Sequence, residues 1–207
     1  MGYVVTDQQV DPLYTVDLSS PTAPRVAGQI ELEGYSAYLQ PLTSTLLLGI
    51  GEDVSTATNE PTGAQMELFD VSNPASPQLL AKASLGLGSS SQVTYDHHAF
   101  LYWPATNLAV LPVQVNSFTV PITCGPPPCL TPLQPAGQSF TGALAFRVGQ
   151  SGIQQLGQIV QDSSNGLTPV IERSLVVGDQ LFTVSQQGVM ASSLDTLARQ
   201  AFVSFPA

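Results

Sequence analysis

The stretch that decides the fold reads LFDVSNPASP at residues 68–77, and nearly the same pattern, YTVDLSSPTAP, occurs at residues 14–24. Each copy places an aspartate, Asp17 or Asp70, at the end of a run of alternating apolar residues. A serine and two prolines follow. Asp and Ser side chains accept hydrogen bonds from turn backbone, and proline is tolerated at sheet edges. We therefore interpret the motif as a corner between two strands, with Asp17 and Asp70 as structural turn residues.

The spacing of this motif gives a repeat length. Asp17 and Asp70 are 53 residues apart, and the same frame fits Arg147 and, 46 residues later, Ser193. The 77 residues between Asp70 and Arg147 contain a proline-rich segment. Removing about 25 residues there as an inserted loop restores a period of about 50, within the range of strand repeats.

Each repeat is predicted to contain four short strands, because β-branched and aromatic runs alternate with clusters of Gly, Pro, Ser and Asn. Four strands in a period of about 40–50 residues are typical of a β-propeller blade. A β-sandwich is the competing all-β fold, but it gives no reason for the motif to return in register. The predicted blades are 1–34 (partial), 35–90, 91–165 with an insertion at 116–140, and 166–207.

About three complete blades and a partial N-terminal blade cannot close a ring, because propellers have at least about four blades. The chain is therefore expected to be a single all-β domain that forms a fragment or half-ring. The remaining blades of the same propeller, another protein or a second copy in a homodimer would complete it.

The composition excludes some classes of partner. Charged residues make up 10% of the 207-residue chain, and the formal net charge is −10 with Lys82 as the single lysine. Nucleic-acid binding needs clustered Lys and Arg, so no nucleic-acid partner is expected for this acidic protein. The apolar runs have the length of strands, so no transmembrane segment is expected.

The two cysteines, Cys124 and Cys129, flank the sequence GPPP. A stiff turn of this kind can bring two cysteines into bridging range, and we expect a disulfide, which favours an oxidising, extracytoplasmic compartment. The alternative is half of a metal site, although no nearby Cys or His completes the ligand set.

Both histidines of the chain follow a carboxylate in the sequence Asp96-His97-His98. The run from His97 to Trp103 is predicted to be a strand, and neighbouring strand residues point to opposite faces. The two histidines are therefore not expected to share one metal ion. The main interpretation is a structural brace formed by Asp96 with His97, while His98 is a candidate for a ligand or metal contact.

Glu52 and Asp53 are a second candidate ligand or metal site, in a predicted loop that runs to Gly63. Paired carboxylates can bind calcium or act in glycoside hydrolysis. The alternating ligand spacing of calcium loops is absent, so a solvated loop is the default interpretation. The sequence contains no nucleophile motif of the form G-x-S-x-G, and no catalytic residue or cofactor is predicted.

The chain resembles a family of secreted prokaryotic proteins with a C-terminal β-propeller domain. The resemblance rests on five segments spread over nearly the whole chain: VDPLYTVDLS (10–19), GIG (49–51), LFDVSNP (68–74), YDHHAFL (95–101) and ERSL (172–175). It implies a propeller fold outside the cytoplasm and brings no catalytic set to transfer. The insertion around Cys124 and Cys129 departs from the family pattern.

Together these observations predict an extracytoplasmic, secreted or cell-envelope propeller that acts as a scaffold for binding a protein or ligand. The alternative is a propeller-type hydrolase or lyase that uses carboxylates from several blades in the central funnel. An enzyme of that kind should show convergent carboxylates with perturbed pKa values near the propeller axis.

Overall fold

A computed structural model describes residues 1–6, 12–55, 57–58, 60–115, 139–162 and 166–206, together with the backbone of residues 129–130. The protein is all-β and forms four sheets, each built mainly from antiparallel strands. Within the described residues, no helix is long and apolar enough to cross a membrane.

The first sheet has three strands, β1 (Gly2–Val4), β2 (Leu13–Asp17) and β3 (Arg25–Ile30), in the order β1-β2-β3. The second sheet has four consecutive strands, β4 (Tyr35–Pro41), β5 (Leu46–Val54), β6 (Pro61–Asp70) and β7 (Gln78–Ser84). A short strand from the insertion, β11 (Cys129–Leu130), pairs with β7 in parallel and becomes the fifth strand.

The third sheet is built on β10 (Leu108–Val115), β12 (Phe140–Gly149) and β13 (Gly152–Ile159). Its inner edge consists of two short strands, β8 (Ser89–Ser90) and β9 (Leu101–Trp103), which pair with opposite ends of β10. The fourth sheet runs in order through β14 (Ile171–Val177), β15 (Gln180–Ser185), β16 (Gly188–Ser193) and β17 (Arg199–Ser204).

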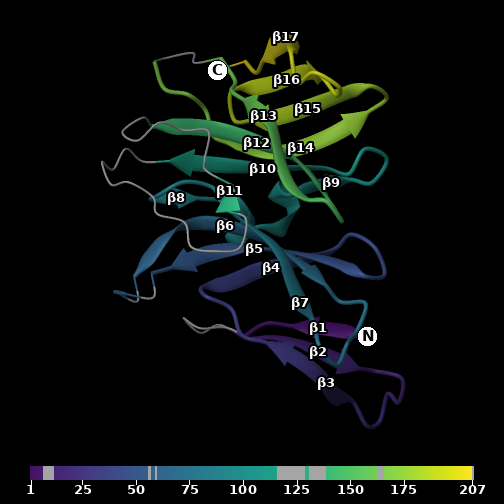
Figure 1. The fold of residues 1–207 in the computed structure, drawn as a ribbon. Helices are drawn as coiled ribbons and strands as arrows, with labels where there is room; N and C mark the ends of the chain where they lie inside the picture. Colours follow the sequence, from purple (N-terminus) through teal and green to yellow (C-terminus); the bar gives the residue numbers. More distant parts are fainter. Residues whose placement is uncertain are drawn as a thin grey trace.

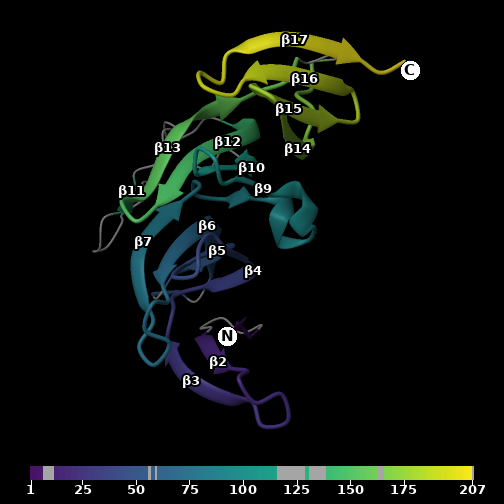
Figure 2. The same cartoon turned by 90° about the vertical axis from the view of Figure 1, so that its right-hand side faces the viewer.

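The four sheets follow one another around an arc as propeller blades do (Figures 1 and 2), so the predicted fold class is confirmed. Figure 2 shows β3, β7, β13 and β17 toward the convex side, whereas β4, β9 and β14 lie toward the concave side. The first and fourth sheets stand at the two ends of the arc, which does not close into a ring.

Apolar side chains between neighbouring sheets hold the arc together. The largest cluster joins the second and third sheets through residues such as Met66, Leu68, Leu111 and Phe146. A second cluster joins the third and fourth sheets, and a third joins Leu13 and Leu32 to Phe69. Burial of these side chains is the main stabilising contribution, because apolar surface removed from water on folding lowers the free energy.

The repeated positions lie at or near the end of one strand in each sheet. Asp17 ends β2, Asp70 ends β6 and Ser193 ends β16, while Arg147 lies two residues before the end of β12. Asp17 accepts a hydrogen bond from the Ser19 backbone N–H at 2.9 Å, and Asp70 accepts one from the Ser72 N–H at 2.8 Å. Hydrogen bonds from Ser19, chiefly its backbone N–H, hold the pKa of Asp17 below the ordinary value, and those from Ser72, its side chain first and its N–H second, do the same for Asp70.

Candidate functional site

The inner edge of the third sheet is interrupted by two 3₁₀ turns, η1 (Gln92–Thr94) and η2 (His97–Ala99), which lie between β8 and β9. Pro112 explains where the interruption falls. Its carbonyl accepts a hydrogen bond from the Ser91 hydroxyl at 2.7 Å. The nitrogen and the carbonyl of a strand residue point to the same side, so the Pro112 nitrogen also faces this edge. A proline nitrogen has no hydrogen to donate to a partner strand. The chain therefore leaves the sheet, and Figure 2 shows the two turns on the concave side of the arc.

The prediction of a strand from His97 was wrong, because residues 97–99 form η2 and pairing begins only at Leu101. In a 3₁₀ turn, side chains do not alternate between two faces. One ligand atom each from Asp96, His97 and His98 lies within 4.8 Å of the others. The objection that the two histidines point apart therefore does not hold for this structure.

Asp96 organises the turn. It is the N-cap of η2, where its Oδ1 accepts from the His98 backbone N–H at 3.0 Å and lies 3.1 Å from His98 Nδ1. Its other oxygen, Oδ2, forms an ion pair with Arg173 on β14 at 2.6 Å. The hydrogen bond from the His98 N–H is the first cause that holds the pKa of Asp96 below its ordinary value. The hydrogen-bonding partner of Asp96 is thus His98, where the sequence had suggested His97.

His97 instead connects the turn to the second sheet. Its ring stacks on Tyr38 of β4, with centroids 5.8 Å apart, and lies 4.0 Å from the ring of His98. The Tyr38 hydroxyl donates to Gln40 Oε1 at 2.6 Å, and burial raises the pKa of this tyrosine. Side chains from three sheets therefore meet on the concave side. We call Tyr38, Asp96, His97, His98 and Arg173 the concave cluster.

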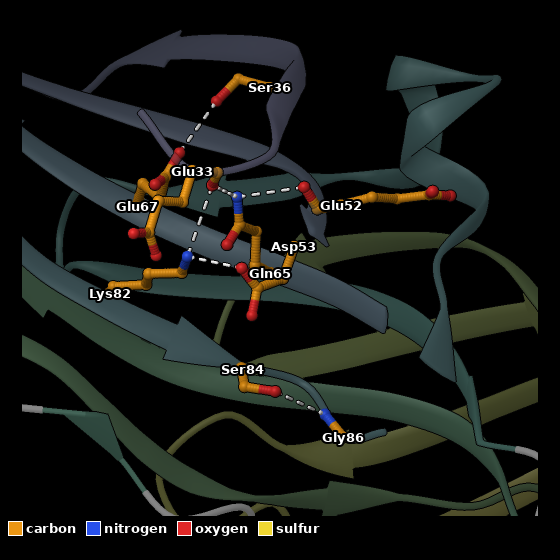
Figure 3. A network of polar contacts seen from close by, with 9 residues as sticks. All are labelled: Glu33, Ser36, Glu52, Asp53, Gln65, Glu67, Lys82, Ser84 and Gly86. Atoms are coloured by element: carbon orange, nitrogen blue, oxygen red, sulfur yellow. Dashed lines mark hydrogen bonds and ion pairs between the residues drawn. The ribbon is translucent and has the colours of Figure 1, made fainter. Parts of the chain in front are cut away.

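The second predicted pair, Glu52 and Asp53, is placed differently from the prediction. Both residues lie in β5, which continues to Val54 and pairs with β6, so the expected loop is a strand. Figure 3 shows the side chain of Glu52 directed away from the polar network to which Asp53 belongs. Neighbouring strand positions place the two carboxylates on opposite faces, and they do not form a paired site.

Asp53 belongs to a network that the sequence did not predict, centred on Glu67 of β6 (Figure 3). Glu67 is 1% exposed and pairs in register with Gly49 on β5 and Lys82 on β7. It shares a face of the second sheet with Phe69, which packs against the first sheet. Ser36 donates a hydrogen bond to its carboxylate at 3.4 Å.

Burial is the main reason that the pKa of Glu67 is raised to about 7. The positive charge of Lys82 acts in the opposite direction, while Asp53 and Glu33 add to the increase. Lys82 is itself held by Asp53, with Nζ 2.6 Å from Oδ1, and by the Glu33 carbonyl at 3.4 Å. The network therefore has a buried centre at Glu67, while Lys82 and Asp53 are partly exposed at its margin.

The predicted disulfide cannot be placed, because Cys124 and the side chain of Cys129 lie outside the described residues. The backbone of Cys129 pairs with that of Lys82 in the β11–β7 ladder. The insertion thus returns from the third blade to the outer edge of the second.

The sequence profile of a family described as Beta propeller domain matches residues 1–197. An uncharacterized protein of Methanocaldococcus jannaschii is 32% identical over 117 residues, and one of Archaeoglobus fulgidus is 31% identical over 118 residues. These alignments cover 56% and 57% of this chain but 18% of each relative, so the matched part spans less than a fifth of either relative's length.

Among solved structures, a mutant of the Synechocystis apocarotenoid oxygenase superimposes with a TM-score of 0.43 and 8% sequence identity. The superposition covers 98% of this chain and 45% of the oxygenase chain.

Proposed function

Because this chain belongs to the Beta propeller domain family, we propose that it is an extracytoplasmic scaffold that binds a protein partner on its concave face. The observation that carries the proposal is the concave cluster, in which side chains from three separate blades form one surface. Tyr38 comes from the second blade, Asp96 from the third and Arg173 from the fourth.

The composition of this surface supports protein recognition. Tyr95, between η1 and η2, is 85% exposed, and the His98 side chain is 69% exposed. Tyrosine and arginine are enriched among the residues that contribute most to protein–protein binding, and a rigid scaffold reduces the entropy lost on binding. The compartment is proposed from the resemblance to secreted propeller proteins and from the spacing of Cys124 and Cys129.

The distribution of pKa values favours a scaffold over a hydrolase or lyase. A general acid or base that works at neutral pH needs a pKa near 7 and access to the substrate. Glu67 has such a pKa, but it is buried between the first and second blades. Asp96, on the concave side, has a lowered pKa and is occupied by His98 and Arg173.

The faces at the two ends of the arc support a further part of the proposal, which is that the remaining blades of the propeller cover them. On the fourth sheet, Val177 and Val203 are 59% and 65% exposed, and on the first sheet Val26 is 63% exposed. These valines lie on β14, β17 and β3, and exposed apolar surface on the end sheets of the arc is expected of faces that a further blade covers. Sedimentation of the 207-residue chain should show self-association, whereas a compact monomer at all concentrations would contradict this part.

Site-specific photo-crosslinking in the producing cell tests the binding face. A photoreactive phenylalanine at Tyr95 is expected to form an adduct with a partner, whereas the same residue at Leu156, an exposed position on the convex strand β13 (Figure 2), should not form that adduct. Absence of an adduct from Tyr95, or equal adducts from both positions, would contradict binding at the concave face. Protease treatment of intact cells tests the compartment, and a protected chain would contradict the extracytoplasmic proposal.

A further inference from the structure

We propose that Asp96, His97 and His98 bind a divalent transition-metal ion, with zinc as the best match. The proposal rests on the convergence of one carboxylate and two imidazole donors within 4.8 Å on an accessible turn. It goes beyond the scaffold proposal, because a metal ion can bind here whether or not a protein partner does.

The distances suit a small ion. Zinc bonds of about 2.0–2.1 Å to nitrogen and oxygen place two ligands of a tetrahedron about 3.3–3.4 Å apart. Asp96 Oδ1 and His98 Nδ1 are 3.1 Å apart, close to this value. A ligand atom of His97 lies within 4.8 Å of those of Asp96 and His98, so all three donors converge on one region, and His97 must move closer to reach tetrahedral spacing.

The donors are supported by neighbours that do not compete for the same atoms. Arg173 contacts Oδ2 of Asp96, whereas Oδ1 accepts a hydrogen bond from the His98 N–H and has a second lone pair with which to coordinate an ion. Tyr38 stacks on the His97 ring and limits its rotation. Contacts of this kind orient metal ligands, and their loss in known sites typically weakens binding by about 10–100-fold.

The donor set selects the class of metal. Imidazole suits zinc, copper, nickel and iron, whereas calcium and magnesium prefer sites made of oxygen ligands. Three protein ligands leave the fourth coordination position of a tetrahedral ion open. Because the His98 side chain is largely exposed, we expect this open position to face solvent. The positive charge of Arg173 opposes a second cation, so we expect micromolar rather than nanomolar affinity.

The experiment is a zinc titration of the untagged 207-residue chain, followed by calorimetry and by competition with a chromophoric chelator. We expect one zinc ion per chain, and the visible absorption of cobalt(II) should report a low-symmetry site with nitrogen and oxygen ligands. The His98→Ala and Asp96→Asn variants should bind at least about 10-fold more weakly. Asp195→Asn, which removes an exposed carboxylate from the β16–β17 turn, is the matched control and should bind as the unaltered chain does.

The side chains of His98 and Asp96 are partly exposed, so these variants are expected to stay folded, and circular dichroism with thermal melting verifies this. The proposal is overturned if the unaltered chain does not bind zinc at millimolar concentration. It is also overturned if His98→Ala and Asp96→Asn, when folded, bind zinc as tightly as Asp195→Asn does. Because no partner protein enters the titration, neither result depends on the crosslinking experiment.

Discussion

Arg173 on β14 forms an ion pair with Asp96 at the cap of η2, with 2.6 Å between Nη2 and Oδ2, and so links the fourth blade to the third on the concave side of the arc. Apolar contacts also join these two blades, and hydrogen bonds from Gln161 to Thr183 and an ion pair between Arg199 and Asp162 add polar links. The ion pair between Arg173 and Asp96 fixes how the turn that carries both histidines lies against the neighbouring blade.

Arg173→Gln is expected to lower the melting temperature by about 1–3 °C at low ionic strength, because ion pairs at partly exposed positions contribute little and are screened by salt. Asp96→Asn should have a larger effect, since Asp96 also accepts from the His98 N–H. Arg25→Gln, which breaks a pair within the first sheet, is the control. A double-mutant cycle between Arg173 and Asp96 should show coupling that disappears in 1 M salt; coupling that persists there would refute this account.

Asp96 should also make the free energy of unfolding depend on pH in the acidic range. Its folded-state pKa is below the ordinary value, so its contribution is fully present above the unfolded-state pKa and is lost as pH falls through the folded-state pKa. In denaturant titrations from pH 6 down to pH 2, Asp96→Asn should therefore lose less stability than the unaltered chain. Equal losses in the two proteins would show that Asp96 makes no such contribution.

The raised pKa of Glu67 predicts that the free energy of unfolding depends on pH in the opposite direction. Burial raises its pKa from 4.5 to about 7, so between these values the folded protein holds a proton that the unfolded chain has released. Stability should therefore fall as pH rises from about 4.5 to 7. Glu67→Gln should remove this slope and, at pH 8, increase the free energy of unfolding by up to about 3 kcal/mol.

Urea titrations at pH 5 and pH 8 measure this effect, with the exposed Glu31→Gln as the matched control. If Glu67→Gln changes stability equally at both pH values, Glu67 is not protonated on folding.

Lys82 is expected to matter most when Glu67 is ionised. Lys82→Met removes the partner of Asp53 and the positive charge that favours the Glu67 carboxylate. We expect a loss of about 2 kcal/mol at pH 8, between the values typical of exposed and buried ion pairs. The loss should be smaller at pH 5, and smaller in the Glu67→Gln background. Additive effects of the two substitutions would show that these side chains do not interact.

A substitution at Gly51 tests how closely β4 and β5 approach each other beside this network. A Cβ atom at Gly51 would lie 1.8 Å from the Tyr35 carbonyl oxygen, which is backbone and cannot move aside. Gly51→Ala should therefore destabilise the protein by about 2–4 kcal/mol or prevent folding. Gly149→Ala is the matched control, because nothing lies within 4 Å of its Cβ position. Similar melting temperatures for the two variants would contradict the steric argument.

The strands could be predicted from the sequence because each buries one face against the next blade, which produces the alternation seen in β2 and β15. The loop expected between Gly51 and Gly63 was wrong because β5 and β6 extend beyond their apolar centres, where backbone pairing alone continues them. The strand propensities of the individual residues do not indicate pairing of that kind.

The concave cluster could not be predicted, since it depends on a break in one strand. Pro112, in the neighbouring strand β10, was the available signal, because a proline in a central strand argues against a complete partner strand. Glu67 gave no comparable signal. The order Gln65-Met66-Glu67-Leu68 is also that of a strand with one face in water, and only the packing of the first blade shows that this face is covered.

The parallel pairing of β11 with β7 has a mechanical consequence. In repeat architectures each unit contacts only its neighbours, so units can separate one after another under load. Here a segment that leaves the third blade is hydrogen-bonded to the outer strand of the second, so pulling these blades apart requires that ladder to shear as well. The second and third blades are therefore joined by a backbone ladder as well as by apolar packing, and part of the outer edge of β7 is covered against intermolecular pairing.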